Sequence, residues 1–148
     1  MLPKVYKIGI SKTRGQKMIN QGQINVIAGK GIKNDRFYKI NNKKISQITI
    51  IEKEKIDDFN ALVDRSIDYL DFRRNIISEG IELNNLVNKT FLIGSVKILA
   101  HKLCEPCFYL QKSLNQNNLF EKLSNKAGLR CEIITDGKIS IGDFIKIY

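Results

Sequence analysis

The sequence predicts a mainly β protein: a closed or partly open β-barrel with a few short helical insertions. Most of its apolar stretches are short and are separated by glycine, asparagine or aspartate, the residues that favour turns. Several stretches alternate apolar and polar side chains, as half-buried strands do. Apolar residues at helical spacing occur only from residue 52 to 63, over 108–114 and over 119–127. Many strands with few helices are typical of a barrel.

The chain is long enough for one domain with its own core. Its 148 residues are 43% hydrophobic, which suffices for a single domain over residues 1–148 but not for two. The first residues contain no apolar run of signal-peptide length, and every other apolar run is far shorter than the roughly 20 residues of a membrane helix. We therefore expect a cytoplasmic protein that does not enter a membrane.

The first half of the chain predicts three strands and one helix. Residues 5–10 and 23–28 carry mostly alternating apolar positions, and the polar loop 32–36 follows a glycine-rich break. Asn34 in that loop tolerates a left-handed backbone. Residues 45–51 are rich in β-branched side chains and predict a buried strand, after which the period changes to that of a helix at Glu52.

The second half predicts further strands and tight turns. Extended chain is expected over residues 69–77, 91–93, 96–101 and 129–134. Gly94-Ser95 and Gly142-Asp143 indicate turns, and Asp136-Gly137 is the strongest hairpin pattern of the chain. Residues 81–86 predict a tight loop or one turn of helix.

The pair Cys104-Glu105-Pro106-Cys107 lies between a predicted strand and the predicted helix 108–114. Pro106 favours the first turn of a helix, where its missing N–H is not needed. Cys107 is then expected at a helix N-terminus, where free N–H groups favour a thiolate. Glu105 opposes that effect, so another positive charge is needed nearby.

A formal net charge of +10 raises the question of nucleic-acid binding. The lysines are scattered, however, and no basic block alternates with aromatic residues. We expect neither a specific nucleic-acid partner nor a membrane partner.

The cysteines and the single histidine allow several chemistries. Cys131 alternates with Leu129 and Ile133 and is expected to be buried. A Cys–His nucleophilic pair is disfavoured, because His101 is only three residues from Cys104 on an extended chain. A structural zinc site from the histidine and all three cysteines lacks the usual second CxxC, and a redox CxxC lacks its βαβ surroundings.

A third chemistry is a thiolate that ligates a soft metal or accepts sulfur. Either role needs a deprotonated sulfur in an electropositive pocket. Arg36, Arg73 and Arg74 would supply the positive charge and would also bind phosphate. The alternative for the two adjacent arginines is one surface ion pair with Asp71 and one solvated side chain, and the residues alone leave both interpretations open.

Five stretches taken together resemble one known family, the molybdenum cofactor sulfurase C-terminal (MOSC) domains. Residues 31–36 resemble its glycine-rich GDR loop, and residues 72–77 resemble its RRN segment. The other three stretches are residues 47–52, residues 91–107 with the cysteine pair, and residues 128–143 with the closing turns. They occur in the family's order over nearly the whole chain.

The resemblance implies a β-barrel that handles molybdenum cofactor or sulfur. In some members a cysteine ligates molybdenum and N-hydroxylated compounds are reduced; in others the domain carries sulfur delivered by a pyridoxal-phosphate desulfurase. By position, Cys107 would be the catalytic thiol and metal ligand. The resemblance places the other expected cofactor-binding residues at Asp35, Arg36, Arg73, Arg74, Asn75 and Cys104.

Two departures from the family pattern bear on function. Asn34 stands where the family has glycine, a mild change, and Phe37 stands where it commonly has histidine, which removes a proton donor. Pyridoxal phosphate is not expected in this domain. The leading hypothesis is a molybdenum cofactor-binding protein with Cys107 as metal ligand or persulfide carrier, served by a cysteine desulfurase or an electron-transfer partner. The alternatives are a small reductase of N-hydroxylated compounds and a zinc-stapled or nucleic-acid-binding module.

Overall fold

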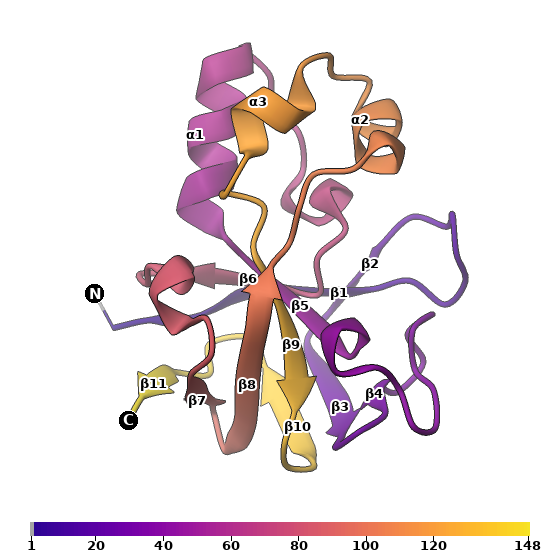
Figure 1. Ribbon diagram of the computed structural model, residues 1–148, viewed down its shortest axis with the longest axis vertical. Coiled ribbons are helices and arrows are strands. Elements are labelled where there is room, and N and C mark those ends of the chain that lie inside the picture. Colours follow the sequence, from indigo (N-terminus) through magenta and orange to yellow (C-terminus); the bar gives the residue numbers. More distant parts are fainter. Residues whose placement is uncertain (1) are drawn as a thin grey trace.

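The computed structural model describes residues 2–148 and is a mainly β fold with three short helices (Figure 1). The strands along the chain are β1 (Lys4–Ile10), β2 (Ile19–Gln21), β3 (Gln23–Ile27), β4 (Gly31–Ile32), β5 (Ile48–Glu52), β6 (Ile76–Glu79), β7 (Thr90–Ile93), β8 (Val96–Leu103), β9 (Leu129–Ile133), β10 (Gly137–Ser140) and β11 (Ile145–Ile147). The helices are α1 (Lys53–Val63), α2 (Phe108–Leu114) and α3 (Leu119–Leu123). Single turns of 3-10 helix are η1 (Lys44–Ser46), η2 (Tyr69–Phe72) and η3 (Leu83–Leu86).

The strands form a strongly curled, partly open barrel, as the sequence predicts. An eight-stranded sheet has the order β11-β7-β8-β9-β5-β6-β1-β2, and a three-stranded sheet has the order β10-β3-β4. Among the pairings of these strands only β5 with β6 is parallel. The chain between those two strands contains α1 and η2, because parallel neighbours need a long crossover.

The barrel interior is one cluster of buried apolar side chains from both sheets, among them Ile24, Ile50, Ile98 and Ile139. Alternation along the strands selects these side chains. On β9, for example, Leu129, Cys131 and Ile133 are buried inside while the residues between them point outward.

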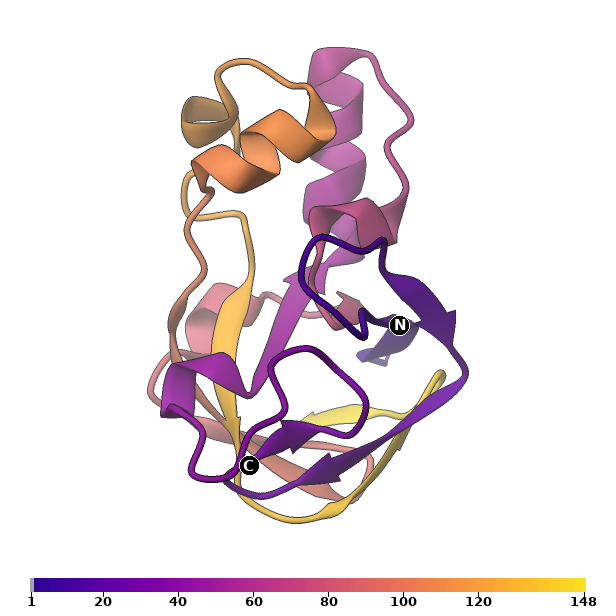
Figure 2. The same cartoon turned by 90° about the vertical axis from the view of Figure 1, so that its right-hand side faces the viewer.

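The three helices gather at one end of the barrel, above the strands in Figures 1 and 2. They cover the outer face of β5 and β6. Ile50 and Ile76 lie in the barrel interior, whereas their neighbours Ile51 and Ile77 pack under the helices in a second apolar cluster. These strands therefore carry buried apolar residues on both faces, which explains why the consecutive residues Ile50 and Ile51 of β5, and Ile76 and Ile77 of β6, are all buried.

Several predicted elements are confirmed. Residues 91–93 and 96–101 form the β7–β8 hairpin, residues 108–114 form α2, and residues 81–86 contain the single helical turn η3. Asn34 has the expected left-handed backbone, with φ of 71°.

Other predictions were wrong in part. The stretch 69–77 is not extended throughout: η2 is followed by Arg73 in a left-handed conformation before β6 begins. The strand predicted over 45–51 begins only at Ile48, and the helix predicted over 119–127 ends at Leu123. Pro106 lies before the first residue of α2 and not within its first turn.

The Asp136-Gly137 turn does not make a hairpin. The strands on its two sides do not pair with each other, since β9 pairs with β5 and β8 while β10 pairs with β3. The turn instead carries the chain from one sheet to the other. The Asp136 carboxylate accepts a hydrogen bond of 2.7 Å from the Ala28 backbone N–H, which joins the turn to the far end of β3.

No helix within residues 2–148 is long and apolar enough to cross a membrane.

Candidate functional site

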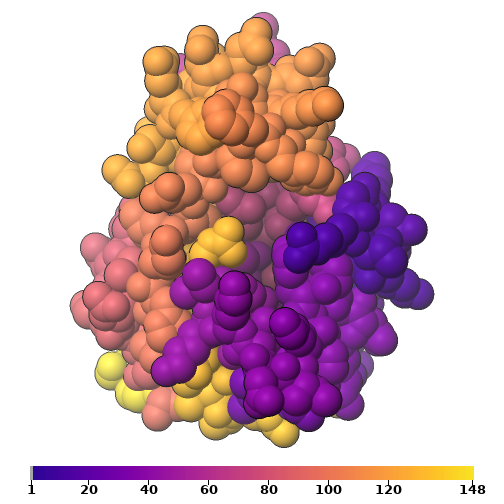
Figure 3. All heavy atoms as spheres, turned by 45° about the vertical axis from the view of Figure 1, so that its right-hand side comes forward, coloured from indigo at the N-terminus to yellow at the C-terminus, as the bar shows by residue number. Residues whose placement is uncertain are grey.

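A cavity of about 250 Å³ lies between the helices and the barrel, and we call it the arginine pocket. Figure 3 shows it as a recess bordered by the N-terminal loop, the loop after β4 and the start of α2. Its lining residues come from six separate parts of the chain: Arg14, Gly15, Arg36, Phe37, Thr49, Arg73, Arg74, Cys107, Tyr109, Leu110 and Arg130. Five of them are arginines and none is acidic, so the pocket is built to receive an anion.

Cys107 is exposed and lines this pocket. It occupies the N-cap position of α2, with an extended backbone, and its Sγ accepts a hydrogen bond from the Leu110 N–H at 3.4 Å. The prediction of a helix N-terminus at Cys107 is therefore confirmed. The thiol is within reach both of a ligand in the pocket and of a molecule arriving from solvent.

Arg36 is the most enclosed cation of the pocket. Its guanidinium donates to the Asp35 carboxylate at 3.2 Å and to the sulfur of Met18 at 3.4 Å, and it lies over the Phe37 ring. Burial lowers the pKa of Arg36, and the positive charges of Arg73 and Arg74 add to that effect against the opposing pull of Asp35. The three guanidinium groups therefore repel one another, and a bound anion would relieve that repulsion.

Arg73 and Arg74 both enter the pocket although they are consecutive residues. The left-handed backbone of Arg73, with φ of 63°, makes this arrangement reachable, because neighbours in an extended chain point to opposite sides. Arg73 donates to the Gln16 carbonyl oxygen at 2.8 Å and lies over the ring of Tyr109.

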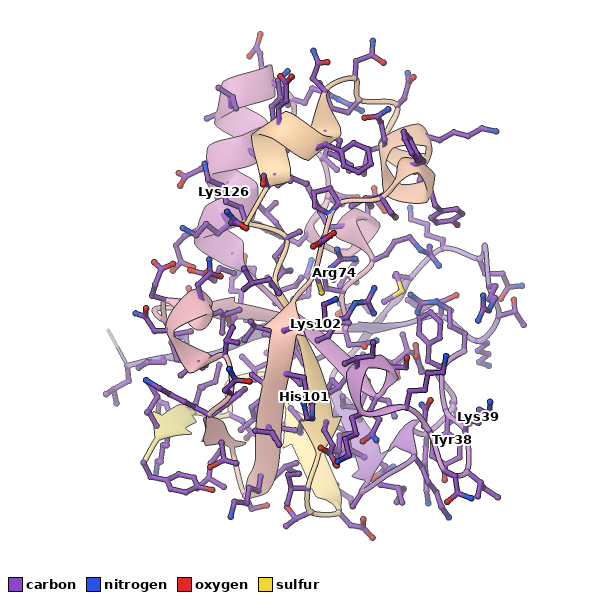
Figure 4. The ribbon with its side chains drawn as sticks, viewed as in Figure 1. Tyr38, Lys39, Arg74, His101, Lys102 and Lys126 are labelled. Atoms are coloured by element: carbon purple, nitrogen blue, oxygen red, sulfur yellow. The ribbon has the colours of Figure 1, made fainter. Side chains whose placement is uncertain are left out.

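Arg74 donates through Nε to the Ala127 carbonyl oxygen at 2.9 Å, and Figure 4 places it at the junction of helices and barrel. No ion pair with Asp71 forms among residues 2–148, so the surface-pair alternative fails. Both guanidinium groups are held by neutral carbonyl oxygens, and their charges remain available to a ligand.

Sequence reasoning missed several residues of the pocket. Arg130 follows Leu129 on β9, and the strand alternation that buries Leu129 and Cys131 turns Arg130 to the outer face, so this position was recoverable. Arg14 belongs to the loop after β1 and lies over the Phe37 ring at 5.5 Å. No pattern in the sequence indicates its position.

Three residues predicted to bind the cofactor do not line the pocket. Asp35 is buried and accepts hydrogen bonds from the backbone N–H groups of Ser11 and Phe37, which fixes the loop that carries Arg36. Cys104 is buried, and its N–H donates to the Gly128 carbonyl oxygen at 2.7 Å.

Asn75 is the third of these residues and holds three strands together. Its side-chain oxygen accepts from the N–H and the hydroxyl of Thr49 on β5, while its amide nitrogen donates to the Gly9 carbonyl oxygen on β1. These bonds engage both polar atoms of the side chain inside the protein. They also orient Thr49, which does line the pocket.

The structure does not support the Cys–His pair or the zinc site that the sequence analysis considered for His101. His101 lies on β8, well down the barrel from Arg74 in Figure 4, and its Nε2 is 2.8 Å from a carboxylate oxygen of Glu132. Within residues 2–148 no three His, Cys, Asp or Glu side chains are gathered so that they could hold a metal ion. The zinc-stapled alternative therefore lacks its ligand set.

The family comparison agrees with the resemblance found in the sequence. The family model of the MOSC domain matches residues 38–146. No curated protein matches the chain significantly.

Solved structures show the same fold at low sequence identity. The YuaD protein from Bacillus subtilis is 18% identical with a TM-score of 0.84, and the alignment covers 98% of this chain and 94% of that one. YiiM from Geobacillus stearothermophilus is 13% identical with a TM-score of 0.81, covering 99% and 75%. YiiM from Escherichia coli is 16% identical with a TM-score of 0.72, covering 99% and 68%. The family model matches most of this chain, and the solved structures share its fold. This chain therefore belongs to the MOSC domain family, which is linked in general to binding of molybdenum cofactor.

Proposed function

We propose that the arginine pocket binds the phosphate-bearing end of a molybdopterin-type cofactor and that Cys107 is the protein's thiol ligand to molybdenum. One observation carries this proposal: an exposed thiol and five arginines line the same cavity, and no carboxylate neutralises it from the lining. Thiolate is a preferred ligand of soft metals, and guanidinium groups bind phosphate in a bidentate way.

The residues present fit the chemistry of that group. Arg36, Arg73 and Arg74 would hold the phosphate, and the rings of Phe37 and Tyr109, which also line the pocket, would border the organic part of the cofactor. When bound, the cofactor would supply a redox-active metal that exchanges oxygen or sulfur. A volume of about 250 Å³ is slightly below the usual range for ligand pockets, about 300–1,000 Å³, so part of the cofactor would remain outside the cavity.

A second candidate function is favoured by the exposure of Cys107. A thiol at the surface, at the rim of a basic cavity, suits a sulfur carrier that another protein can reach. In that case the Cys107 thiolate attacks the outer sulfur of a persulfide on the donor. The new S–S bond forms on Cys107 as the donor's S–S bond breaks, and the donor leaves as a thiolate, so no external oxidant or reductant is needed.

The test compares metal and pterin content after expression in a host that makes the cofactor. Wild type is expected to carry molybdenum and pterin together, Cys107→Ser to lose most of the molybdenum, and Arg73→Ala to lose pterin as well. Cys104→Ala is the matched control, because it removes a thiol that lies outside the pocket lining, and it should retain the wild-type content.

The two roles of Cys107 separate in further measurements. A cofactor-dependent reductase should turn over N-hydroxylated compounds with an electron donor and lose that turnover in Cys107→Ser. A carrier should instead gain one sulfur atom on Cys107 without turnover, detected by mass spectrometry. Wild type that contains neither molybdenum nor pterin, and that gains no sulfur on Cys107, would contradict both roles.

A further inference from the structure

An exposed apolar surface directly adjoins Cys107 on α2 and α3. Phe108 and Tyr109 follow Cys107 and are 76% and 54% exposed, and Phe120 of α3 is 40% exposed. The rings of Phe108 and Phe120 contact each other edge to face, with 4.9 Å between their centroids. We call these three side chains the aromatic surface; it belongs to the helical part that overhangs the recess in Figure 3. Clustered, exposed aromatic rings indicate a binding surface.

The charges beside the aromatic surface are mixed on the helices and positive in the adjoining pocket. Lys112 is exposed one turn further along α2, and the five arginines of the pocket lie on the other side of Cys107. Two exposed carboxylates, Glu105 and Glu121, offset Lys112 on the helices, so the positive excess comes from the pocket arginines. A partner with complementary charge would therefore carry acidic residues around an apolar centre.

The position of Cys107 decides what kind of partner this is. Sulfur exchange between proteins requires the donor sulfur to contact the Cys107 Sγ directly. Phe108, the next residue, has an exposed side chain, so a protein that approaches Cys107 from this side of α2 would cover it. The same contact therefore delivers the reagent and buries the aromatic surface.

We propose that the aromatic surface is the docking site for a sulfur-donor protein that presents a cysteine persulfide on an acidic face with an apolar centre. This inference rests on the carrier role proposed above for Cys107. Docking would place the donor sulfur at the rim of the arginine pocket, and transfer would follow the balanced thiolate attack already described. Burial of the aromatic rings would supply most of the affinity, and charge would raise the association rate.

The experiment compares two sources of sulfur for the same thiol. One is a cysteine desulfurase with acidic residues bordering its active-site loop, supplied with cysteine; the other is inorganic polysulfide, which needs no docking. The rate at which Cys107 gains sulfur is measured by mass spectrometry. In the Phe108→Ala/Phe120→Ala double variant the rate from the desulfurase should fall by about ten-fold or more, as for loss of an interface hot spot. The rate from polysulfide should stay at the wild-type value.

The matched control is Phe144→Ala, which truncates another phenylalanine, 47% exposed, directly before β11. Figure 1 shows β11 at the end of the molecule away from α2. It should leave both rates unchanged. Raising the salt concentration should slow transfer from the desulfurase to wild type and leave polysulfide loading nearly constant.

Each contrary result has its own meaning. Equal rates from the desulfurase for wild type and the double variant, or loading of wild type by polysulfide alone, would overturn the docking site while leaving Cys107 as a sulfur acceptor. Slower polysulfide loading in the double variant would show that the rings support the site's structure instead. No loading of wild type from either source would overturn the carrier role itself. Salt-sensitive binding of single-stranded RNA that requires Phe108 and Phe120 would assign the surface to nucleic acid.

Discussion

The barrel interior and the arginine pocket lie on opposite faces of the same strand and are built on opposite principles. On β5, Ile48 and Ile50 point into the barrel interior, while Thr49 points to the pocket. The interior is formed by apolar side chains that alternate regularly along many strands. The pocket is assembled from loops, helix ends and outward positions whose residues follow no period. Regular alternation in the sequence therefore determines the barrel, whereas separate, irregular features determine the chemistry of the pocket.

The three cysteines offer the sharpest test of this difference. Cys131 lies in the barrel interior, where burial raises its pKa well above the ordinary value, and Cys104 is also buried, whereas Cys107 is exposed at the pocket. In the native protein an alkylating reagent should modify Cys107 faster than the other two by about 10³-fold or more, because those thiols react only after the structure opens. Time-resolved peptide mass spectrometry measures the three rates. Equal rates for Cys107 and Cys104 would contradict the distinction between the two thiols.

The second test concerns Gly128, where the chain returns from the helices to the barrel. Its φ is +98°, and a Cβ atom there would clash with the Ile50 carbonyl oxygen. Gly128→Ala should therefore lower the free energy of unfolding by about 4 kcal/mol or more, since backbone on β5 would have to move. Urea denaturation followed by circular dichroism measures it.

Gly142→Ala is the matched control for that substitution. Gly142 also has a left-handed φ, +90°, but nothing lies within 4 Å of an added Cβ. The expected loss is only the backbone strain, about 1–2 kcal/mol. A similar loss in both variants would show that strain, and not the contact with β5, makes Gly128 necessary.

The smallest effect is expected at Glu52, a buried carboxylate at the end of β5 on the side away from the pocket arginines. Burial raises its pKa from 4.5 to about 7, and the charge of Glu82 adds to the rise, against the opposing effects of Lys55 and the Leu83 N–H. The folded protein thus holds this proton more tightly than the unfolded chain does. The resulting stability is fully present below about pH 4.5 and is lost as the pH rises through about 7.

The Glu52→Gln variant isolates this contribution because it keeps the shape and removes the charge. It should be more stable than wild type by about 1–3 kcal/mol at pH 8 and similar to it at pH 5, measured by urea denaturation at both values. A constant difference between the two proteins over that range would mean that Glu52 does not titrate there.

Much of the barrel could be predicted from the sequence, because strands that are buried on one or both faces show a regular pattern of apolar residues. This pattern correctly predicted the hairpin of β7 and β8 and the burial of Cys131. The hairpin prediction failed because strand pairing there depends on a strand far away in the sequence. Asp136-Gly137 has the local chemistry of a hairpin turn, yet the strand after it pairs with β3, more than a hundred residues earlier.

The candidate site was predicted less completely, for a related reason. Cys107, Arg36, Arg73 and Arg74 all reach the pocket. The two adjacent arginines were expected on extended chain, but Arg73 has a left-handed backbone and both side chains line the pocket. No local sequence pattern predicts a left-handed backbone at an arginine. Nor did the sequence reveal Arg14, which reaches the pocket only because the fold brings the loop after β1 beside Phe37.

The pairing of β3 with a strand near the other end of the sequence has a consequence for synthesis. The β3 strand pairs with β10, and the Ile145 N–H donates to the Pro3 carbonyl oxygen, so the two ends of the sequence meet. While a ribosome is still translating, β3 has no partner on that edge, and Ile24 and Val26 remain open to other chains. This pairing can therefore form only after translation has delivered residues 137–140, and until then the β3 edge is open to pairing with other chains.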